Sequence, residues 1–477
     1  MVTKKKITLT SGQKDVFENL VDFIRDKSAR IFILKGYAGT GKTTMMKVLI
    51  EELKKRNLSY SLLASTGRAA KILCNITGQS AKTIHSEIYT YQDLNQDLEE
   101  VVRVRMTGID LGGQLLLTFS LNVVEREKGS TRYYIVDEAS MISDKEDKNA
   151  TQAFFGSGRL LKDLLDYDGT GKFIFIGDAC QLPPVTQRIS PALSVEYFKQ
   201  VFNIQAQEAE LTEIVRQKDN NGIVLSSKNI RNLYANPQPW KWAKFPFRNY
   251  SNIHIIPNQD TFIQSYIDRV KMRGFNDSTL ICFSNKQCDT ITNIIRPSLG
   301  IHSPQLSPGD LLMITQNNYF SGLMNGDLAV VESIDVEKKK AGLTFVKVSV
   351  KELFTQNTYS LFLIADILYS NQTNLTQTQQ KELLIDFYQR MKRIGIGQKH
   401  PLFNTQMMKD PYLNALRAVY GYALTCHKAQ GGEWNHVYLD ITRNVPALEK
   451  PYVYQWIYTA MTRAKVKLYL VEDFWIS

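Results

Sequence analysis

Residues 36–43 read Gly-Tyr-Ala-Gly-Thr-Gly-Lys-Thr, and this glycine-rich stretch constrains the fold more than any other part of the 477-residue chain. It stands after an apolar run at 30–34 and opens a helical pattern at 43–55, which is the strand–loop–helix setting that a phosphate loop needs. Glycines let the backbone wrap around phosphate groups, so that its N–H groups and the helix N-terminus point at negative charge. The stretch therefore predicts an α/β domain that binds a nucleoside triphosphate.

Two side chains at the end of this loop are expected to take part in the chemistry. Lys42 would hold the β- and γ-phosphates, and the hydroxyl of Thr43 would ligate Mg²⁺. The other contacts to the nucleotide from this loop are expected from Gly36, Ala38, Gly39, Thr40, Gly41 and Thr44.

An Asp-Glu pair follows a second apolar run, at 133–136. Ligands of parallel sheets bind at the carboxyl ends of the strands, and a third such run at 173–176 belongs to the same predicted sheet. Asp137 is expected to enter the Mg²⁺ shell, and Glu138 to orient and deprotonate the attacking water. A phosphate loop alone is also compatible with a kinase, whereas this pair favours hydrolysis.

Two segments interrupt the α/β pattern. Apolar and polar side chains alternate at 102–106 and 117–123 on either side of a glycine-containing turn, which predicts a β-hairpin inserted at about 92–128. Short strand-like runs at 311–314, 328–331 and 344–350 predict a small β-barrel inserted at about 320–412.

Composition narrows the class of protein. Lys and Arg number 58 against 47 Asp and Glu, a formal charge of +11 that suits a polyanionic partner without establishing one. The five cysteines form no CxxC pair and have no histidine at zinc-finger spacing, which indicates reduced thiols. No run approaches the ~18 apolar residues of a membrane span, and the polar start has no signal-peptide core. We expect a cytoplasmic protein that binds no membrane.

A set of short motifs, in a fixed order, resembles the superfamily 1 helicases of the RecD and Dda group. Residues 133–141 (YYIVDEASM) resemble motif II, and 177–185 (GDACQLPPV) resemble motif III. The remaining pieces are LTSGQ at 9–13 (Q motif), ASTGRAA at 64–70 (Ia), TIH at 83–85 (Ib), LTEIVRQ at 211–217 (IV), TCHKAQG at 425–431 (V) and YTAMTR at 458–463 (VI). The resemblance covers most of the chain, and the ordered set is much more specific than any single motif.

The resemblance implies that the nucleotide is ATP, and it implies roles for the residues around it. Gln13 would read the adenine, and Gln181 would sense the γ-phosphate. Arg216 and Arg463 would be arginine fingers, because planar, always-charged guanidinium groups from a second domain stabilise a charge-dispersed phosphoryl transition state. Glu433 would accept a hydrogen bond from the ribose.

The resemblance also implies which residues face the nucleic acid. Small donors at these positions suit contacts to phosphate and sugar, which position a strand without reading its sequence. The residues concerned are Thr66, Arg68, His85, Thr425, His427 and Lys428. An aromatic run with interleaved lysines at 240–250 fits either a stacking platform for bases or packing between domains.

We therefore expect an α/β chain of two RecA-like P-loop NTPase domains with parallel sheets. The first spans 1–205 and carries the hairpin. The second spans 206–477, and its small barrel would resemble the family's SH3-like insert. ATP and Mg²⁺ would bind between the domains.

The group implies a DNA helicase that moves 5′→3′ on single-stranded DNA and opens duplex junctions. From its residues, the predicted hairpin would project an apolar tip, Ile109 and Leu111, that could act as a wedge at the junction. The alternative for the hairpin is simple packing on the first domain. The alternatives for function are an RNA helicase or remodeller, and an ATPase subunit of a larger recombination or repair complex. We expect a monomer, with accessory replication or recombination proteins as further candidate partners.

Overall fold

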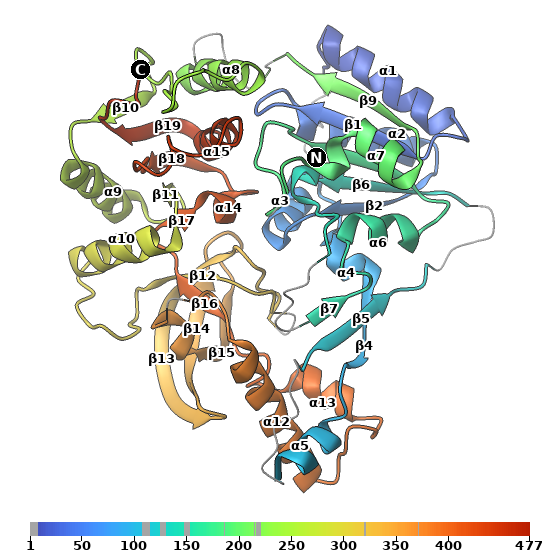
Figure 1. Cartoon of the computed structure of the whole chain (residues 1–477), viewed down its shortest axis with the longest axis vertical. Helices are drawn as coiled ribbons and strands as arrows, with labels where there is room; N and C mark the ends of the chain where they lie inside the picture. The colour runs from blue at the N-terminus through green and yellow to red at the C-terminus, as the bar shows by residue number, and fades with distance from the viewer. Residues whose placement is uncertain are drawn as a thin grey trace, which may run out of the picture.

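The computed structural model describes residues 8–106, 115–124, 130–146, 153–185, 187–213, 215, 221–318, 321–370 and 372–477. Two parallel sheets, each flanked by helices, lie side by side, and two smaller sheets extend from them toward one end of the molecule (Figure 1). The expected α/β class with parallel sheets is confirmed. None of the helices in these ranges is long and apolar enough to cross a membrane.

The first parallel sheet has six strands in the order β3-β2-β6-β8-β1-β9. Its strands are β1 (Ile31–Gly36), β2 (Ser59–Ala64), β3 (Ala81–Thr83), β6 (Arg132–Asp137), β8 (Lys172–Gly177) and β9 (Ala206–Leu211). Its helices are α1 (Ser11–Arg25), α2 (Lys42–Lys55), α3 (Gly67–Thr77), α4 (Ile84–Ile88), α6 (Leu160–Tyr167) and α7 (Val195–Phe202), with 3₁₀ turns η1 (Ala139–Met141) and η2 (Pro191–Leu193). The central strands are continuous apolar runs because they are buried on both faces.

Strand β9 corrects the expected domain boundary. It pairs in parallel with β1 along its whole length, so residues 206–211 belong to the first sheet. The expected first domain ends at residue 205, whereas its sheet continues six residues further. The polar positions of β9 alternate with buried ones, as expected for an edge strand, and gave no apolar run to extend the sheet.

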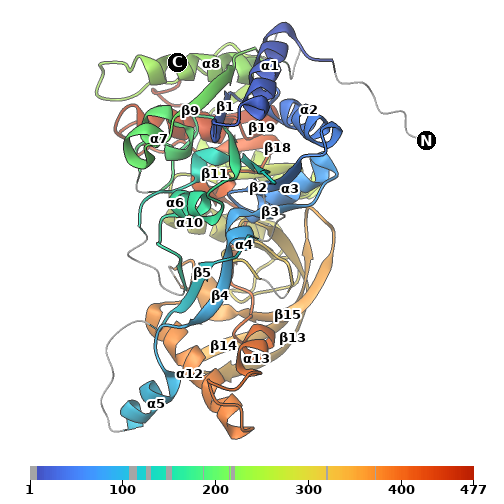
Figure 2. The same cartoon turned by 90° about the vertical axis from the view of Figure 1, so that its right-hand side faces the viewer.

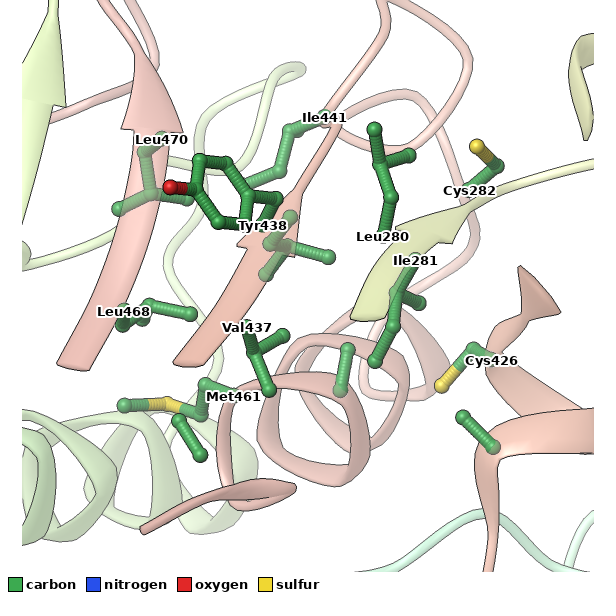
Figure 3. Packing of buried hydrophobic residues seen from close by; sticks show 14 of the residues in the cluster. Leu280, Ile281, Cys282, Cys426, Val437, Tyr438, Ile441, Met461, Leu468 and Leu470 are labelled. Atoms are coloured by element: carbon green, nitrogen blue, oxygen red, sulfur yellow. The ribbon is translucent and has the colours of Figure 1, made fainter. Parts of the chain in front are cut away.

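The second parallel sheet has five strands in the order β10-β19-β18-β11-β17. They are β10 (Ile253–Ile256), β11 (Ser278–Cys282), β17 (Leu424–Thr425), β18 (Trp434–Leu439) and β19 (Ala464–Val471). Its helices are α8 (Gly222–Ala235), α9 (Gln259–Arg273), α10 (Asn285–Ser298), α14 (Cys426–Ala429) and α15 (Tyr452–Met461). Val437 and Ile281 point toward α15, whereas their chain neighbours Tyr438 and Leu280 point to the opposite face (Figure 3).

The aromatic run at 240–250 divides between core and surface. Phe245 and Phe247 are fully buried in the core of the second sheet, so that part of the run packs. Trp240 is 65% exposed, and Trp242 contacts Phe474 edge to face.

The predicted hairpin is wrong in its first strand. Residues 98–106 form a helix, α5 (Leu98–Met106), and β5 (Leu117–Leu121) pairs instead with β4 (Tyr89–Leu94) and β7 (Ala153–Phe155). The proposed tip, with Ile109 and Leu111, lies outside the described residues. The segment fits two patterns, because Leu98, Val101 and Val102 also have the spacing of one helix face. That apolar face packs against another part of the chain, which favours the helix.

The second insert is a five-stranded antiparallel sheet in the order β15-β14-β13-β12-β16. Its strands are β12 (Leu311–Ile314), β13 (Leu328–Lys340), β14 (Leu343–Glu352), β15 (Thr358–Ile364) and β16 (Ala418–Tyr420), with helices α11 (Ala365–Leu368), α12 (Gln377–Arg393) and α13 (Phe403–Lys409). The expected bounds of this insert were residues 320 and 412. The sheet is longer at both ends, since it starts at Leu311 and ends at Tyr420.

The two inserts meet at the end of the molecule away from the parallel sheets (Figures 1 and 2). Leu98 of α5 packs in one apolar cluster with Leu384 and Tyr388 of α12. The backbone N–H of Leu98 also donates to Gln398 Oε1 at 2.7 Å. This contact joins segments about 300 residues apart in the chain.

Candidate functional site

The phosphate loop follows β1 and turns into α2 at Lys42, as the pattern predicts. Gly41 precedes the helix with φ of +94°, a conformation that L side chains rarely adopt. A Cβ on Gly41 would also lie 2.3 Å from Gln13 Nε2. The backbone conformation therefore favours glycine here, and any side chain would also displace the Gln13 amide.

The side chain of Lys42, the first residue of α2, turns back into the phosphate loop. Its Nζ donates to the carbonyl oxygens of Gly36 at 2.6 Å and Tyr37 at 3.1 Å. Thr40 is fully buried and donates from Oγ1 to the same Tyr37 carbonyl at 2.9 Å, whereas Thr43 is exposed at the start of α2. The helix N-terminus thus carries one cation, Lys42, and one exposed threonine, Thr43.

Gln13 touches the phosphate loop from α1. Its Nε2 donates to the Thr40 carbonyl at 3.2 Å, and its Oε1 accepts from the backbone N–H of Thr10 at 3.2 Å in a capping box. The hydroxyl of Thr10 donates to Glu213 Oε2 at 2.6 Å. The segment that resembles the Q motif is therefore joined to the phosphate loop and to the start of the segment that resembles motif IV.

The carboxylate pair stands at the end of β6, beside β8 and two strands from the phosphate loop. Burial, and next the neighbouring Glu138 carboxylate, raises the pKa of Asp137, and the Lys42 ammonium opposes this shift. Glu138 has φ of +51°, an uncommon conformation for a residue with a side chain that occurs often at functional sites.

The residues present fit a magnesium ion. No cluster of three or more His, Cys, Asp or Glu side chains suited to hold a metal occurs among the described residues. Mg²⁺ does not need one, since it is usually held by one or two carboxylates together with phosphate oxygens and waters. Asp137 would supply the carboxylate and Thr43 the hydroxyl.

The loop after β8, a strand of the first sheet, is hydrogen-bonded to residues of the second domain. Gln181 is 4% exposed, and its Oε1 has no hydrogen-bond partner among the described residues. The next residue, Leu182, donates its N–H to Thr459 Oγ1 of α15 at 2.8 Å and accepts from Gln430 Nε2 at 3.2 Å. A buried amide oxygen without a partner at the contact between the two sheets is consistent with a ligand-sensing role.

The two arginines expected to stabilise the transition state have different outcomes. Arg463 is buried, and its guanidinium donates to the carbonyls of Thr459 at 2.9 Å and Gly432 at 3.4 Å. Arg216 lies outside the described residues. Its neighbour Val215 donates its N–H to the Gly39 carbonyl at 3.0 Å, so this segment reaches the phosphate loop.

Two further side chains reach the phosphate loop from the second sheet, and the sequence did not single them out. The Arg231 guanidinium of α8 lies 3.8 Å from the centre of the Tyr37 ring. The hydroxyl of Tyr458, on α15, accepts from the N–H of Ala38 at 3.0 Å. Tyr458 is part of the segment that resembles motif VI, but its position there carried no signal for this contact.

A groove with a cavity of about 960 Å³ opens between the two sheets. From the first side it is lined by Ser65, His85 and residues 183–185, and from the second side by His427 and Gln430. The lining also holds two cations, Lys145 and Arg159, and two carboxylates, Asp144 and Glu146, and Arg159 is paired with Asp144. Segments that resemble motifs Ia, Ib, III and V therefore meet at one cavity, as expected of a nucleic-acid site.

Burial controls the charge of the two groove histidines. It lowers the pKa of His85 to about 4 and also lowers the pKa of His427. The ring of His85 packs edge to face on Phe155. Near neutral pH both rings are therefore expected to act as neutral hydrogen-bonding groups in the groove.

Comparisons with known proteins agree with this arrangement. A family model described as an AAA domain matches residues 8–235, and one described as a UvrD-like helicase C-terminal domain matches residues 420–471. The ATP-dependent DNA helicase dda of Enterobacteria phage T4 is 26% identical over 325 residues, which are 65% of this chain and 61% of that protein. The ATP-dependent RecD2 DNA helicase of Deinococcus radiodurans is 22% identical over 453 residues, 92% of this chain and 46% of that protein. These matches bear out the resemblance to the RecD- and Dda-like superfamily 1 helicases.

The chain spans 61% and 46% of the lengths of these two relatives. The fold is similar to that of a solved Pif1 helicase structure, with a TM-score of 0.50 and 17% sequence identity. That structure is described as the structural basis for DNA unwinding at forked dsDNA by two coordinating Pif1 helicases. It covers 99% of this chain and 94% of that chain. This likeness supports the two-domain RecA-like fold.

Not all helicase motif residues face the groove. Arg68 of motif Ia stacks on Trp434 of the second sheet, 4.4 Å from the ring centre, and burial lowers its pKa to about 10. Thr66 caps α3 by accepting from the N–H of Ala69 at 3.2 Å. Thr66 is thus bonded within the protein, whereas Arg68 Nη1 is buried without a hydrogen-bond partner among the described residues.

Two motif V residues line a separate small cavity of about 30 Å³. Thr425 and Lys428 lie there, and Lys428 Nζ donates to Asn285 Oδ1 at 3.3 Å. They do not line the larger groove with His427, because neighbouring residues at the junction of β17 and the short helix α14 point in different directions. Glu433 is exposed just beyond this helix.

Proposed function

We propose that this chain is an ATP-driven DNA helicase that travels along single-stranded DNA and opens duplex DNA. The observation that carries the proposal is the course of the loop after β8. Its residue Gln181 lies buried in the interface between the sheets, while residues 183–185 line the groove of about 960 Å³. A strand in the groove and a nucleotide on the phosphate loop would act on the same short segment.

The nucleotide site contains the groups that hydrolysis requires. Lys42 would neutralise the β- and γ-phosphates, Asp137 and Thr43 would hold Mg²⁺, and Glu138 would activate the water. Gln13, Gln181, Arg216 and Glu433 keep the roles that the resemblance implies. Mg²⁺, when bound, would neutralise charge that develops on the phosphate oxygens.

Arg463 would complete the site only after a change in the second domain. Its guanidinium is bonded to carbonyls of its own domain, at Thr459 and Gly432. Closure of the cleft around ATP would exchange these bonds for contacts to the γ-phosphate. Such a change is typical of two-domain motors, in which nucleotide binding and strand grip alternate.

The groove suits the backbone of a single strand. His85 and His427 line it as neutral hydrogen-bonding groups, which suit contacts to phosphate and sugar. Alternating grips on the two sides of the groove would move the strand, with 5′→3′ travel implied by the group. The first insert, whose helix α5 packs against α12, would act as the wedge at the duplex junction.

The test is unwinding of partial duplexes by the purified chain with ATP and Mg²⁺. We expect strand separation from substrates with a 5′ single-stranded tail and none from those with a 3′ tail, with Glu138→Gln as the matched inactive control. Unwinding only from 3′ tails would reverse the proposed direction.

The same preparation separates the alternative functions. Stronger ATPase stimulation by an RNA strand than by DNA of matched sequence would favour an RNA remodeller. Strand-stimulated ATPase without unwinding from either tail would favour a subunit that requires partners.

A further inference from the structure

The loop at residues 178–182 follows a strand of the first sheet, yet its hydrogen bonds tie it to the second. Gln455 Nε2 of α15 donates to the carbonyls of Gln181 at 3.2 Å and Ala179 at 3.4 Å. Leu182 is bonded at its N–H to Thr459 and at its carbonyl to Gln430. A displacement of α15 would therefore carry this loop with it.

One hydroxyl joins this loop to the phosphate loop. Tyr458 Oη accepts from the Ala38 N–H at 3.0 Å and donates to Asp178 Oδ2 at 2.7 Å. The other carboxylate oxygen, Oδ1, accepts from the Cys180 N–H at 3.0 Å. Tyr458 and Asp178 are each 1% exposed, so water has little access to replace these bonds.

The neighbouring residue of the phosphate loop is held from the same side. Arg231 of α8 stacks on Tyr37, and α8 packs closely against α15. The middle of the phosphate loop, residues 37 and 38, is thus held by two side chains from two helices of the second domain that pack together.

We propose that Tyr458 is a positioning residue that couples strand binding in the groove to the geometry of the phosphate loop. The inference rests on the proposed helicase function. A strand that contacts residues 183–185 and Gln430 would shift the loop that is bonded to α15. Tyr458 would transmit that shift to Ala38, and so to the phosphates that the loop holds relative to Glu138.

The test compares Tyr458→Phe with Tyr454→Phe in the full chain. Tyr454 is a matched control, because it is buried one turn earlier on α15 and its hydroxyl bonds neither loop among the described residues. Measured quantities are ATP turnover with and without saturating single-stranded DNA, the affinities for ATP and for the strand, and the melting temperature.

We expect Tyr458→Phe to keep both affinities within about two-fold, while strand-stimulated kcat falls on the order of ten-fold, the equivalent of one hydrogen bond to a carboxylate. Tyr454→Phe should keep the stimulation. Asp178→Asn, which retains an acceptor for Cys180 but loses the carboxylate that faces Tyr458, should repeat the defect if the bridge is responsible.

Three outcomes overturn the inference. The first is normal stimulation in Tyr458→Phe. The second is a loss of stimulation that Tyr454→Phe shares. The third is a fall in affinity and melting temperature that accounts for the whole defect, which would make the hydroxyl structural only. Failure of the proposed function would appear separately, as a wild-type chain whose ATP turnover does not respond to a strand.

Discussion

Replacement of Arg463 by alanine tests the arginine finger, and the structure sets the size of the competing structural effect. The guanidinium donates to two carbonyls and to the hydroxyl oxygen of Thr462, and the carbonyl of Thr459 also accepts from that hydroxyl at 3.2 Å. Only the Gly432 carbonyl would lose its side-chain donor. The expected cost in unfolding free energy is therefore that of one unsatisfied buried group, about 1–3 kcal/mol.

This cost is too small to imitate a catalytic defect. A domain stable by about 5–15 kcal/mol remains almost entirely folded after such a loss. Removal of an arginine finger, by contrast, lowers turnover by roughly 10³- to 10⁵-fold. We therefore expect Arg463→Ala to bind ATP within a few-fold of normal and to lose turnover by orders of magnitude.

The assay combines equilibrium ATP binding, strand-stimulated ATP turnover and thermal melting of the same preparation. Arg443→Ala, which removes an exposed cation of the same domain, is the matched control and should behave as wild type. If weaker ATP binding accounts for the whole loss of turnover in Arg463→Ala, the contact is made in the ground state only, and the arginine-finger argument fails.

Three further predictions concern the loop, the strand and the insert. Lys42→Ala should abolish ATP turnover, whereas Glu138→Gln should keep ATP and DNA binding and lose hydrolysis; wild-type turnover by the Glu138→Gln protein would remove that carboxylate from its role. The logarithm of strand affinity should fall linearly with the logarithm of salt concentration, with little sequence dependence, and a strong preference for one sequence would contradict grips on the backbone. Replacement of residues 108–113 by Asn-Gly should retain strand-stimulated ATPase and lose unwinding, and retention of both activities at normal rates would show that this insert is not the wedge.

Local chemistry made the nucleotide site readable from the sequence. The phosphate loop demands glycines where the backbone turns, as the φ of +94° at Gly41 shows, and a cation and a hydroxyl where the helix begins. Asp137 and Glu138 were placed correctly at a strand end because an apolar run buried on both faces precedes them. Such features depend on neighbours within a few residues, so they are visible in the chain itself.

Longer-range features were not readable in this way. Residues 98–106 fit both an alternating and a helical pattern, and the apolar surface of α12, nearly 300 residues later, decided for the helix. The edge strand β9 has polar positions, and its place beside β1 became apparent only in the assembled sheet.

The tertiary structure alone decided which side chains meet between the two sheets. Arg68, which the resemblance placed against nucleic acid, stacks on Trp434, because the close approach of the two domains offers an aromatic face to a buried cation. Tyr458 and Arg231 reach the phosphate loop from helices more than 190 residues away in the chain. Contacts of this kind depend on how two folded domains dock, and no local pattern of residues encodes that geometry.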